Sequence, residues 1–108
     1  MIDQLVEMRG LEQIYYDLVD KPEWVCTVME FMTRGKLRLL ESCKEAGLLI
    51  SNNCGVNIGS SSAGYSNDLP PLDENGGMVT ECDLWGFAQA QEFSEVSGEM
   101  LERFVLPY

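Results

Sequence analysis

The sequence contains no histidine, and this absence removes several kinds of catalytic and metal-binding site. Without histidine there is no Ser–His or Cys–His pair to activate a nucleophile. The four cysteines show no Cys-x-x-Cys spacing, so we predict neither a zinc site nor any other cofactor. An even number of cysteines would permit disulfides, but two of the four fall at apolar positions of a predicted helix, which favours free thiols. The cysteines are Cys26, Cys43, Cys54 and Cys82.

Basic residues are scarce as well. Seven Lys and Arg stand against 18 Asp and Glu, which gives a net charge of -11. Nucleic acids and anionic membranes bind positively charged surfaces, so neither is an expected partner. No apolar run approaches the ~20 residues of a membrane-spanning helix, and no basic stretch followed by an apolar one resembles a secretion signal. Together with free thiols, these features predict a cytoplasmic protein.

Two helices are predicted in the first half of the chain. Apolar residues recur at three- and four-residue spacing over residues 1–19, and Gly10 weakens the middle of this helix. A longer helix is expected from Lys21 to Ala46, with a capping box at Asp20 to Glu23 and Gly47 as its terminating residue. The predicted apolar stripe of the long helix comprises Val25, Val28, Met29, Met32, Leu39, Leu40 and Cys43.

Short apolar runs and loop residues make up the rest of the chain. Leu48 to Ile50 is apolar and bounded by turn residues, which indicates one buried strand of a parallel sheet. Residues 51–80 are typical of a long loop, and we expect this to be the most irregular stretch. Leu84 to Phe87 predicts a strand or a short helical turn. Glu99 to Leu106 predicts a short amphipathic helix.

The last quarter of the chain carries a family resemblance. The chain resembles the uroporphyrinogen decarboxylase family, and its relatives the corrinoid- and thiol-dependent methyltransferases, at Ser97-Gly98-Glu99 and at Phe104-Val105-Leu106-Pro107-Tyr108. Gly98 departs from the proline that is usual at this position in the family. The resemblance extends to the stretch from Gly64 to Pro70, which contains a tyrosine, an aspartate and a Leu-Pro pair.

The resemblance implies a (β/α)8 barrel, which usually needs about 250 residues. This chain has 108 residues and would supply only about a third of a barrel. The predicted long helix is followed by Gly47 and then by the short predicted strand, which is the order of elements in half of a barrel repeat. We therefore predict an α/β fold, a helix-rich barrel fragment with two or three helices, one or two short strands and a long loop. Its single partial domain would comprise residues 1–50, the loop 51–80 and the C-terminal part 81–108.

Candidate pocket residues follow from this placement, because the loops after barrel strands build the active-site face. Asn52 and Asn53 stand where the first predicted strand ends and could orient a carboxylate or a pyrrole N–H. Alternatively, both simply start a turn. Tyr65 could cap a pocket or stack on a flat ligand, or it could anchor its loop to the body of the protein.

Three further candidates lie near the second predicted strand end. Trp85 suits the mouth of a pocket for a flat macrocycle. Gln91 or Glu92 could hydrogen-bond a ligand or take part in proton transfer. The alternative for Glu92 is a solvated charge near a helix start. The sequence assigns no catalytic residue.

The resemblance implies removal of carboxyl groups from a porphyrinogen without a cofactor, or methyl transfer between a corrinoid protein and a thiol. The arginine-rich N-terminal motif of the decarboxylases is absent, and so is the His-x-Cys zinc motif of the methyltransferases. We therefore expect this chain to be inactive alone, with a tetrapyrrole or corrinoid as the ligand of the full-length protein. The alternative is a non-catalytic, acidic, mostly helical protein-interaction module.

The apolar stripe of the long helix is not expected to be covered within one chain, and this predicts that the chain associates with itself. The apolar stripe of the long helix suits a sheet, yet only one or two short strands are expected to cover it. Each large apolar side chain left exposed forfeits roughly 1.5–3 kcal/mol, a large fraction of the stability of a small domain. A homodimer or higher oligomer would cover the stripe. The negative charge opposes association, but salt screens it over about 8–10 Å.

Overall fold

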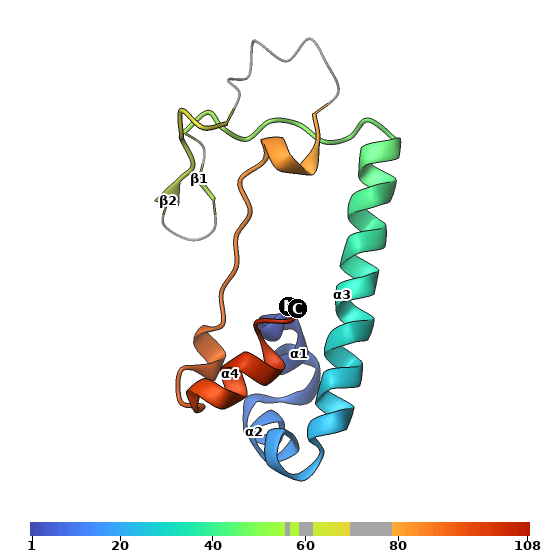
Figure 1. Ribbon diagram of the computed structural model, residues 1–108, viewed down its shortest axis with the longest axis vertical. Coiled ribbons are helices and arrows are strands. Elements are labelled where there is room, and N and C mark those ends of the chain that lie inside the picture. The colour runs from blue at the N-terminus through green and yellow to red at the C-terminus, as the bar shows by residue number, and fades with distance from the viewer. Residues whose placement is uncertain (56, 59–61, 70–78) are drawn as a thin grey trace. The chain divides into compact units, whose positions relative to one another are not determined.

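The computed structural model describes residues 1–55, 57–58, 62–69 and 79–108 (Figure 1). The helices in these residues are α1 (Ile2–Arg9), α2 (Leu11–Asp20), α3 (Pro22–Glu45) and α4 (Gly98–Phe104), with the 3-10 turns η1 (Glu81–Asp83) and η2 (Gln91–Phe93). Two strands of two residues each, β1 (Asn57–Ile58) and β2 (Ser62–Ala63), pair antiparallel. The chain divides into a terminal unit, Met1–Leu37 with Gln89–Tyr108, and an inserted unit, Arg38–Ala88.

The prediction of a barrel fragment is wrong for the residues that the structure describes. These residues are mainly helical, and their strands are the antiparallel pair β1–β2, whereas the strands of a (β/α)8 barrel run parallel. The predicted strand Leu48 to Ile50 is irregular, and Leu84 to Phe87 forms neither a strand nor a helical turn. A three-residue apolar run is not stable as a strand without a neighbour to pair with, and here Leu48 and Ile50 are 67% and 75% exposed.

The helical predictions fare better. The helix expected over residues 1–19 is two helices, because Gly10 adopts a positive φ of 86° that breaks the chain between α1 and α2. The long helix is confirmed to within one residue at each end. Asp20 does not cap it, because Asp20 is the last residue of α2. Gly47 ends it as predicted, with φ of 65° and a hydrogen bond from the next N–H back to the Cys43 carbonyl.

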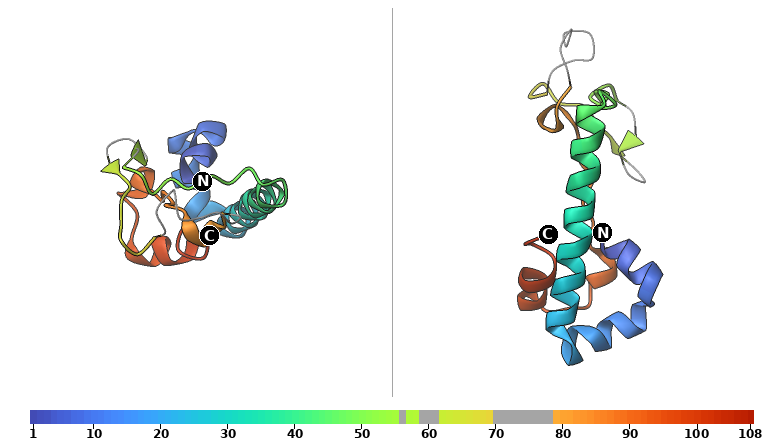
Figure 2. Two further views of the ribbon diagram at one scale, coloured as in Figure 1. Left: turned by 90° about the horizontal axis from the view of Figure 1, so that it is seen from above. Right: turned by 90° about the vertical axis from the view of Figure 1, so that its right-hand side faces the viewer.

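The core of the terminal unit is made by α1, α2, the first half of α3, η2 and α4. Figure 2 shows that α4 and the two N-terminal helices gather around the same end of α3. The Tyr15 hydroxyl adds a polar link, since it donates to the Glu92 carbonyl at 2.6 Å. The eight buried apolar residues of this core are Ile2, Leu5, Ile14, Leu18, Val25, Met29, Phe93 and Phe104.

The apolar stripe predicted for the long helix is buried only in part. Val25 and Met29 are in the core, and Val28 and Met32 pack against it. Every residue from Arg34 to Ser42 is exposed, including the stripe residues Leu39 and Leu40. Among the described residues, none of the helices has the length and apolar content needed to cross a bilayer.

Candidate functional site

Three predicted pocket residues meet within the inserted unit. Asn52 and Asn53 follow α3, and Trp85 follows η1. The Asn52 side chain bonds both backbone groups of Trp85: Oδ1 accepts from the Trp85 N–H at 2.8 Å, and Nδ2 donates to the Trp85 carbonyl at 3.0 Å. The amide thus pairs with the Trp85 backbone as a neighbouring strand would. We call Asn52, Asn53 and Trp85 the Asn–Trp cluster.

Asn53 is the centre of this cluster, and it is buried. Its Nδ2 donates to the carbonyls of Ser66 at 2.9 Å and Leu69 at 3.0 Å. Its Oδ1 accepts from the Ser66 N–H at 2.8 Å and from the Trp85 indole N–H at 3.0 Å. An amide donates two hydrogen bonds and accepts two, so Asn53 is saturated by the protein itself. Among the described residues, one N–H and one acceptor position of the Asn52 amide have no partner.

Two aromatic residues of the inserted unit, Trp85 and Tyr65, expose part of their surface. The Trp85 residue is 36% exposed, and its ring is held in one orientation because Asn53 binds its only donor. Tyr65 directly precedes Ser66 in the segment held by Asn53, and it is 66% exposed. Its hydroxyl makes a long contact of 3.4 Å with Oδ1 of Asn67. A ligand would therefore meet aromatic surface at these positions.

The other two candidates, Gln91 and Glu92, belong to the terminal unit, in η2. Gln91 is exposed. Gln89 Nε2 donates to Asp3 Oδ2 at 3.0 Å. Burial raises the pKa of Asp3, but hydrogen bonds to its carboxylate outweigh this effect, so the net pKa is lowered. Within the described part of the chain, Asp3 Oδ1 and Glu92 Oε2 are buried without a hydrogen-bond partner. The backbone carbonyl of Glu92 accepts from the Tyr15 hydroxyl at 2.6 Å, so Glu92 makes a contact inside the terminal unit.

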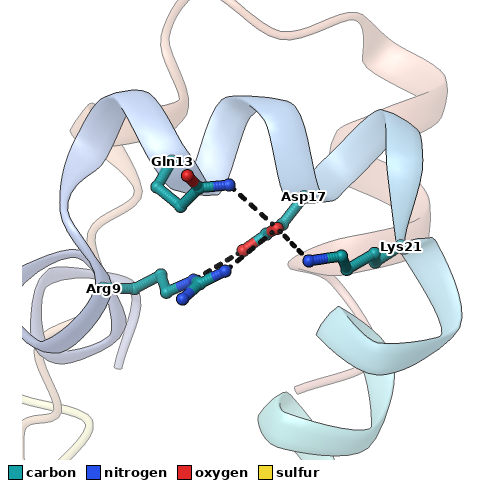
Figure 3. Close-up of polar contacts among 4 residues, drawn as sticks. All are labelled: Arg9, Gln13, Asp17 and Lys21. Carbon is teal, nitrogen blue, oxygen red and sulfur yellow. Dashed lines mark hydrogen bonds and ion pairs between the residues drawn. The ribbon is translucent and has the colours of Figure 1, made fainter.

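Sequence reasoning missed the most heavily bonded charge of the terminal unit, Asp17 (Figure 3). Asp17 is fully buried, and its carboxylate accepts from Arg9 Nε at 2.7 Å and from Gln13 Nε2 at 3.2 Å. Lys21 Nζ lies 3.5 Å from it. The Arg9 hydrogen bond is the main reason that the pKa of Asp17 is lowered, against the effect of burial.

These four residues come from the end of α1, from α2 and from the junction with α3, so the network fixes how the three helices meet. The Arg9 guanidinium also lies 5.4 Å from the centre of the Trp24 ring. A signal was present in the sequence: Arg9, Gln13, Asp17 and Lys21 recur at every fourth position.

Metal ligands do not gather in the parts of the chain that the structure describes. There, no group of three or more Cys, Asp or Glu could hold an ion. The cysteines are free, with Cys26 and Cys43 half-buried and Cys54 and Cys82 exposed.

Comparisons of this chain with family models, with curated proteins and with solved structures give no match. The resemblance to the uroporphyrinogen decarboxylase family stays a prediction that rests on three short stretches, Gly64 to Pro70, Ser97 to Glu99 and Phe104 to Tyr108. In the structure, Ser97 caps α4 by accepting from the Met100 N–H at 3.3 Å, and Phe104 is buried in the core. Ser97 and Phe104 thus both stabilise the terminal unit.

Proposed function

We propose that Trp85 and Tyr65 form a binding surface for a flat macrocycle of the tetrapyrrole or corrinoid class, and that this chain does not catalyse turnover alone. The fixed, partly exposed Trp85 ring carries the proposal. Its backbone is held by Asn52 and its indole by Asn53, so little side-chain freedom is lost when a ligand stacks on it. The resemblance of the C-terminal quarter to the decarboxylase family points to the same ligand class.

The chemistry of the cluster supports binding rather than catalysis. Amides and an indole do not exchange protons at neutral pH, so they cannot act as general acid or base. They can orient a ligand by stacking and by the Asn52 N–H that has no partner in the described part of the chain. Any carboxyl-lyase or methyl-transfer step would need groups that this cluster does not contain, as part of a larger protein.

The charge of the inserted unit favours one of the two ligand classes. The inserted unit has Arg38 and Lys44 as its only basic residues and seven acidic ones. A porphyrinogen with many carboxylates would be repelled by this balance, whereas a corrinoid with amide side chains would not. We therefore place the corrinoid ahead of the polycarboxylate, in a cytoplasmic protein whose cysteines stay reduced.

Tryptophan fluorescence tests this directly, because the chain has only two tryptophans, Trp24 and Trp85. We expect cobalamin to quench the emission saturably, and the Trp24→Leu variant to retain this titration. Trp85→Leu should abolish it. Since Trp85→Leu also removes a hydrogen bond to Asn53, Tyr65→Leu provides a second test at an exposed position and should weaken binding without changing the fold.

Two outcomes would reject the proposal. One is the absence of saturable binding of both cobalamin and uroporphyrin to the wild-type chain. The other is unchanged binding in both the Trp85→Leu and the Tyr65→Leu variants. Binding of uroporphyrin but not of cobalamin would support the proposed surface and show that it prefers the polycarboxylate porphyrin to the corrinoid.

A second candidate function, a non-catalytic acidic helical interaction module, is favoured by a different observation. Large apolar residues on α3 are exposed, among them Phe31 at 72% and Leu39 at 61%. Apolar exposure of this extent is typical of protein-binding surfaces. A chain that binds neither macrocycle but does bind protein would support this alternative.

A further inference from the structure

The second half of α3 continues the buried stripe of its first half, but its stripe residues Leu39 and Leu40 are exposed. Lys36, Leu39, Leu40 and Cys43 follow Met29 and Met32 at three- and four-residue spacing, so they lie on the same helical face. We call these four residues the docking stripe. Leu39 is 61% exposed and Leu40 36%, while Val25 and Met29 on the same face are buried. Exposed apolar residues in continuation of a core face indicate a contact surface.

The charge around the docking stripe is opposite to that of the chain. Between Arg34 and Lys44, α3 carries four of the seven basic residues and only one acidic residue, although the net charge of the chain is -11. Two such segments facing each other would bring their cations together, which disfavours pairing of α3 with α3. The complementary partner is apolar and acidic, and a second copy of this chain offers such a surface.

That surface is an apolar groove in the terminal unit, between the α2–α3 junction and α4. It has a volume of about 320 Å³. Val19 on its rim is 67% exposed, and Glu99 and Asp20 beside it are also exposed. Its cation, Arg103, is already paired with Glu23. The lining residues are Leu18, Val19, Pro22, Glu99, Met100, Arg103 and Phe104.

We propose that this groove receives the docking stripe of a second copy of the chain, with Leu39 and Leu40 against its apolar lining and Lys36 beside Glu99. The contact combines apolar burial with opposite charges, which is what the two surfaces offer separately. Its area is that of one short helical stripe, so the affinity belongs to the weak class of interfaces, in the micromolar range.

Sedimentation equilibrium in reducing buffer at micromolar concentrations tests the contact. Leu39→Ser should weaken association by about tenfold or more, the factor expected when one leucine side chain is no longer buried. Leu37→Ser is the matched control, because Leu37 lies on the same helix with nearly the same exposure, 60% against 61%, but outside the stripe. Val19→Ser in the groove should weaken association as Leu39→Ser does.

Reversing the charges at Lys36 and Glu99 tests whether a second copy of the chain occupies the groove. Lys36→Glu and Glu99→Lys should each weaken self-association. A mixture of the two variants should associate again, because unlike chains form both the wild-type Lys36–Glu99 pair and the reversed pair. A wild-type chain that stays monomeric overturns the proposal. So does an equal loss in the Leu37→Ser and Leu39→Ser variants, or association that persists in both Val19→Ser and Leu39→Ser, since another surface would then be responsible.

Discussion

The two units of this chain are stabilised in different ways. The terminal unit buries eight apolar side chains from five segments, with Asp17 as a buried, fully bonded charge. In the described part of the inserted unit, the buried residues are Ser51, Asn53 and Gly64, and none is a large apolar residue. Apolar burial organises the first unit, whereas the amide hydrogen bonds of Asn52 and Asn53 organise what is seen of the second.

The difference is not one of composition. The inserted unit contains apolar residues that remain exposed, such as Leu48 at 67%, Ile50 at 75% and Phe87 at 57%. They lie in short runs without helical or strand periodicity, so no single face gathers them. Apolar content without periodic spacing is therefore not enough to bring these residues into a core.

Truncation of Ile14 should have the largest effect and tests the apolar side of the comparison. Ile14 is fully buried at the centre of the terminal unit. Ile14→Ala should lower the free energy of unfolding by about 2–5 kcal/mol, through lost burial and the cavity that remains. Ile50→Ala is the control: at 75% exposure, it should change that free energy by no more than about 0.5 kcal/mol. Urea unfolding measures both, and equal losses would contradict the distinction between the units.

Acid titration of Asp17 sharpens the comparison within the terminal unit. Because the pKa of Asp17 is lowered in the fold, its contribution is fully present above its unfolded value of about 3.9 and disappears as the pH falls through the folded value. Asp17→Asn should therefore lower the thermal midpoint by several degrees at pH 7 and flatten its dependence on pH below about 4. Glu12→Gln, at an exposed position of the same helix, should do neither.

Replacing Asn53 tests the amide side of the comparison. Asn53→Ala leaves backbone groups of Ser66 and Leu69 without partners and frees the Trp85 indole. Unsatisfied buried polar groups cost about 1–3 kcal/mol, so the inserted unit should loosen while the helices of the terminal unit persist. Trp85 emission in a Trp24→Phe background should shift to longer wavelength, with far-ultraviolet circular dichroism nearly unchanged. A global loss of helix would show instead that the two units unfold together.

How far the sequence predicts this fold depends on the kind of signal. The long helix follows from its apolar spacing and Gly47, and the structure confirms it. The strand predicted at Leu48 to Ile50 is wrong because an apolar run does not specify the partner that a strand requires. The resemblance to a barrel family implied a parallel sheet in which this strand would pair. The sheet in the described residues is the antiparallel pair β1–β2, and Leu48 to Ile50 are not part of it.

The sequence does not specify the contacts that the candidate residues make. Position at the end of a predicted strand selected Asn52 and Asn53, and the family resemblance selected Trp85. The structure joins these three by hydrogen bonds across more than thirty positions of the sequence. No local pattern specifies that Asn53 would be saturated by distant backbone groups, because those partners depend on tertiary folding. The Asp17 network does have a local pattern, with its members at every fourth position, and was found only in the structure.

The smallest effect is expected for an ion pair of the inserted unit, Lys44 with Glu81. Its atoms lie 3.0 Å apart, much as the Arg9–Asp17 atoms lie at 2.7 Å, but the Glu81 side chain is 44% exposed whereas that of Asp17 is 1% exposed. Solvent and salt screen an exposed pair, and ordering two long side chains offsets most of the attraction. Lys44→Gln should therefore leave the thermal midpoint unchanged within error, at low and at high salt, although the pair raises the pKa of Lys44 through its hydrogen bond to Glu81. A loss as large as that of Asp17→Asn would mean that the inserted unit depends on charge pairing as much as on its amides.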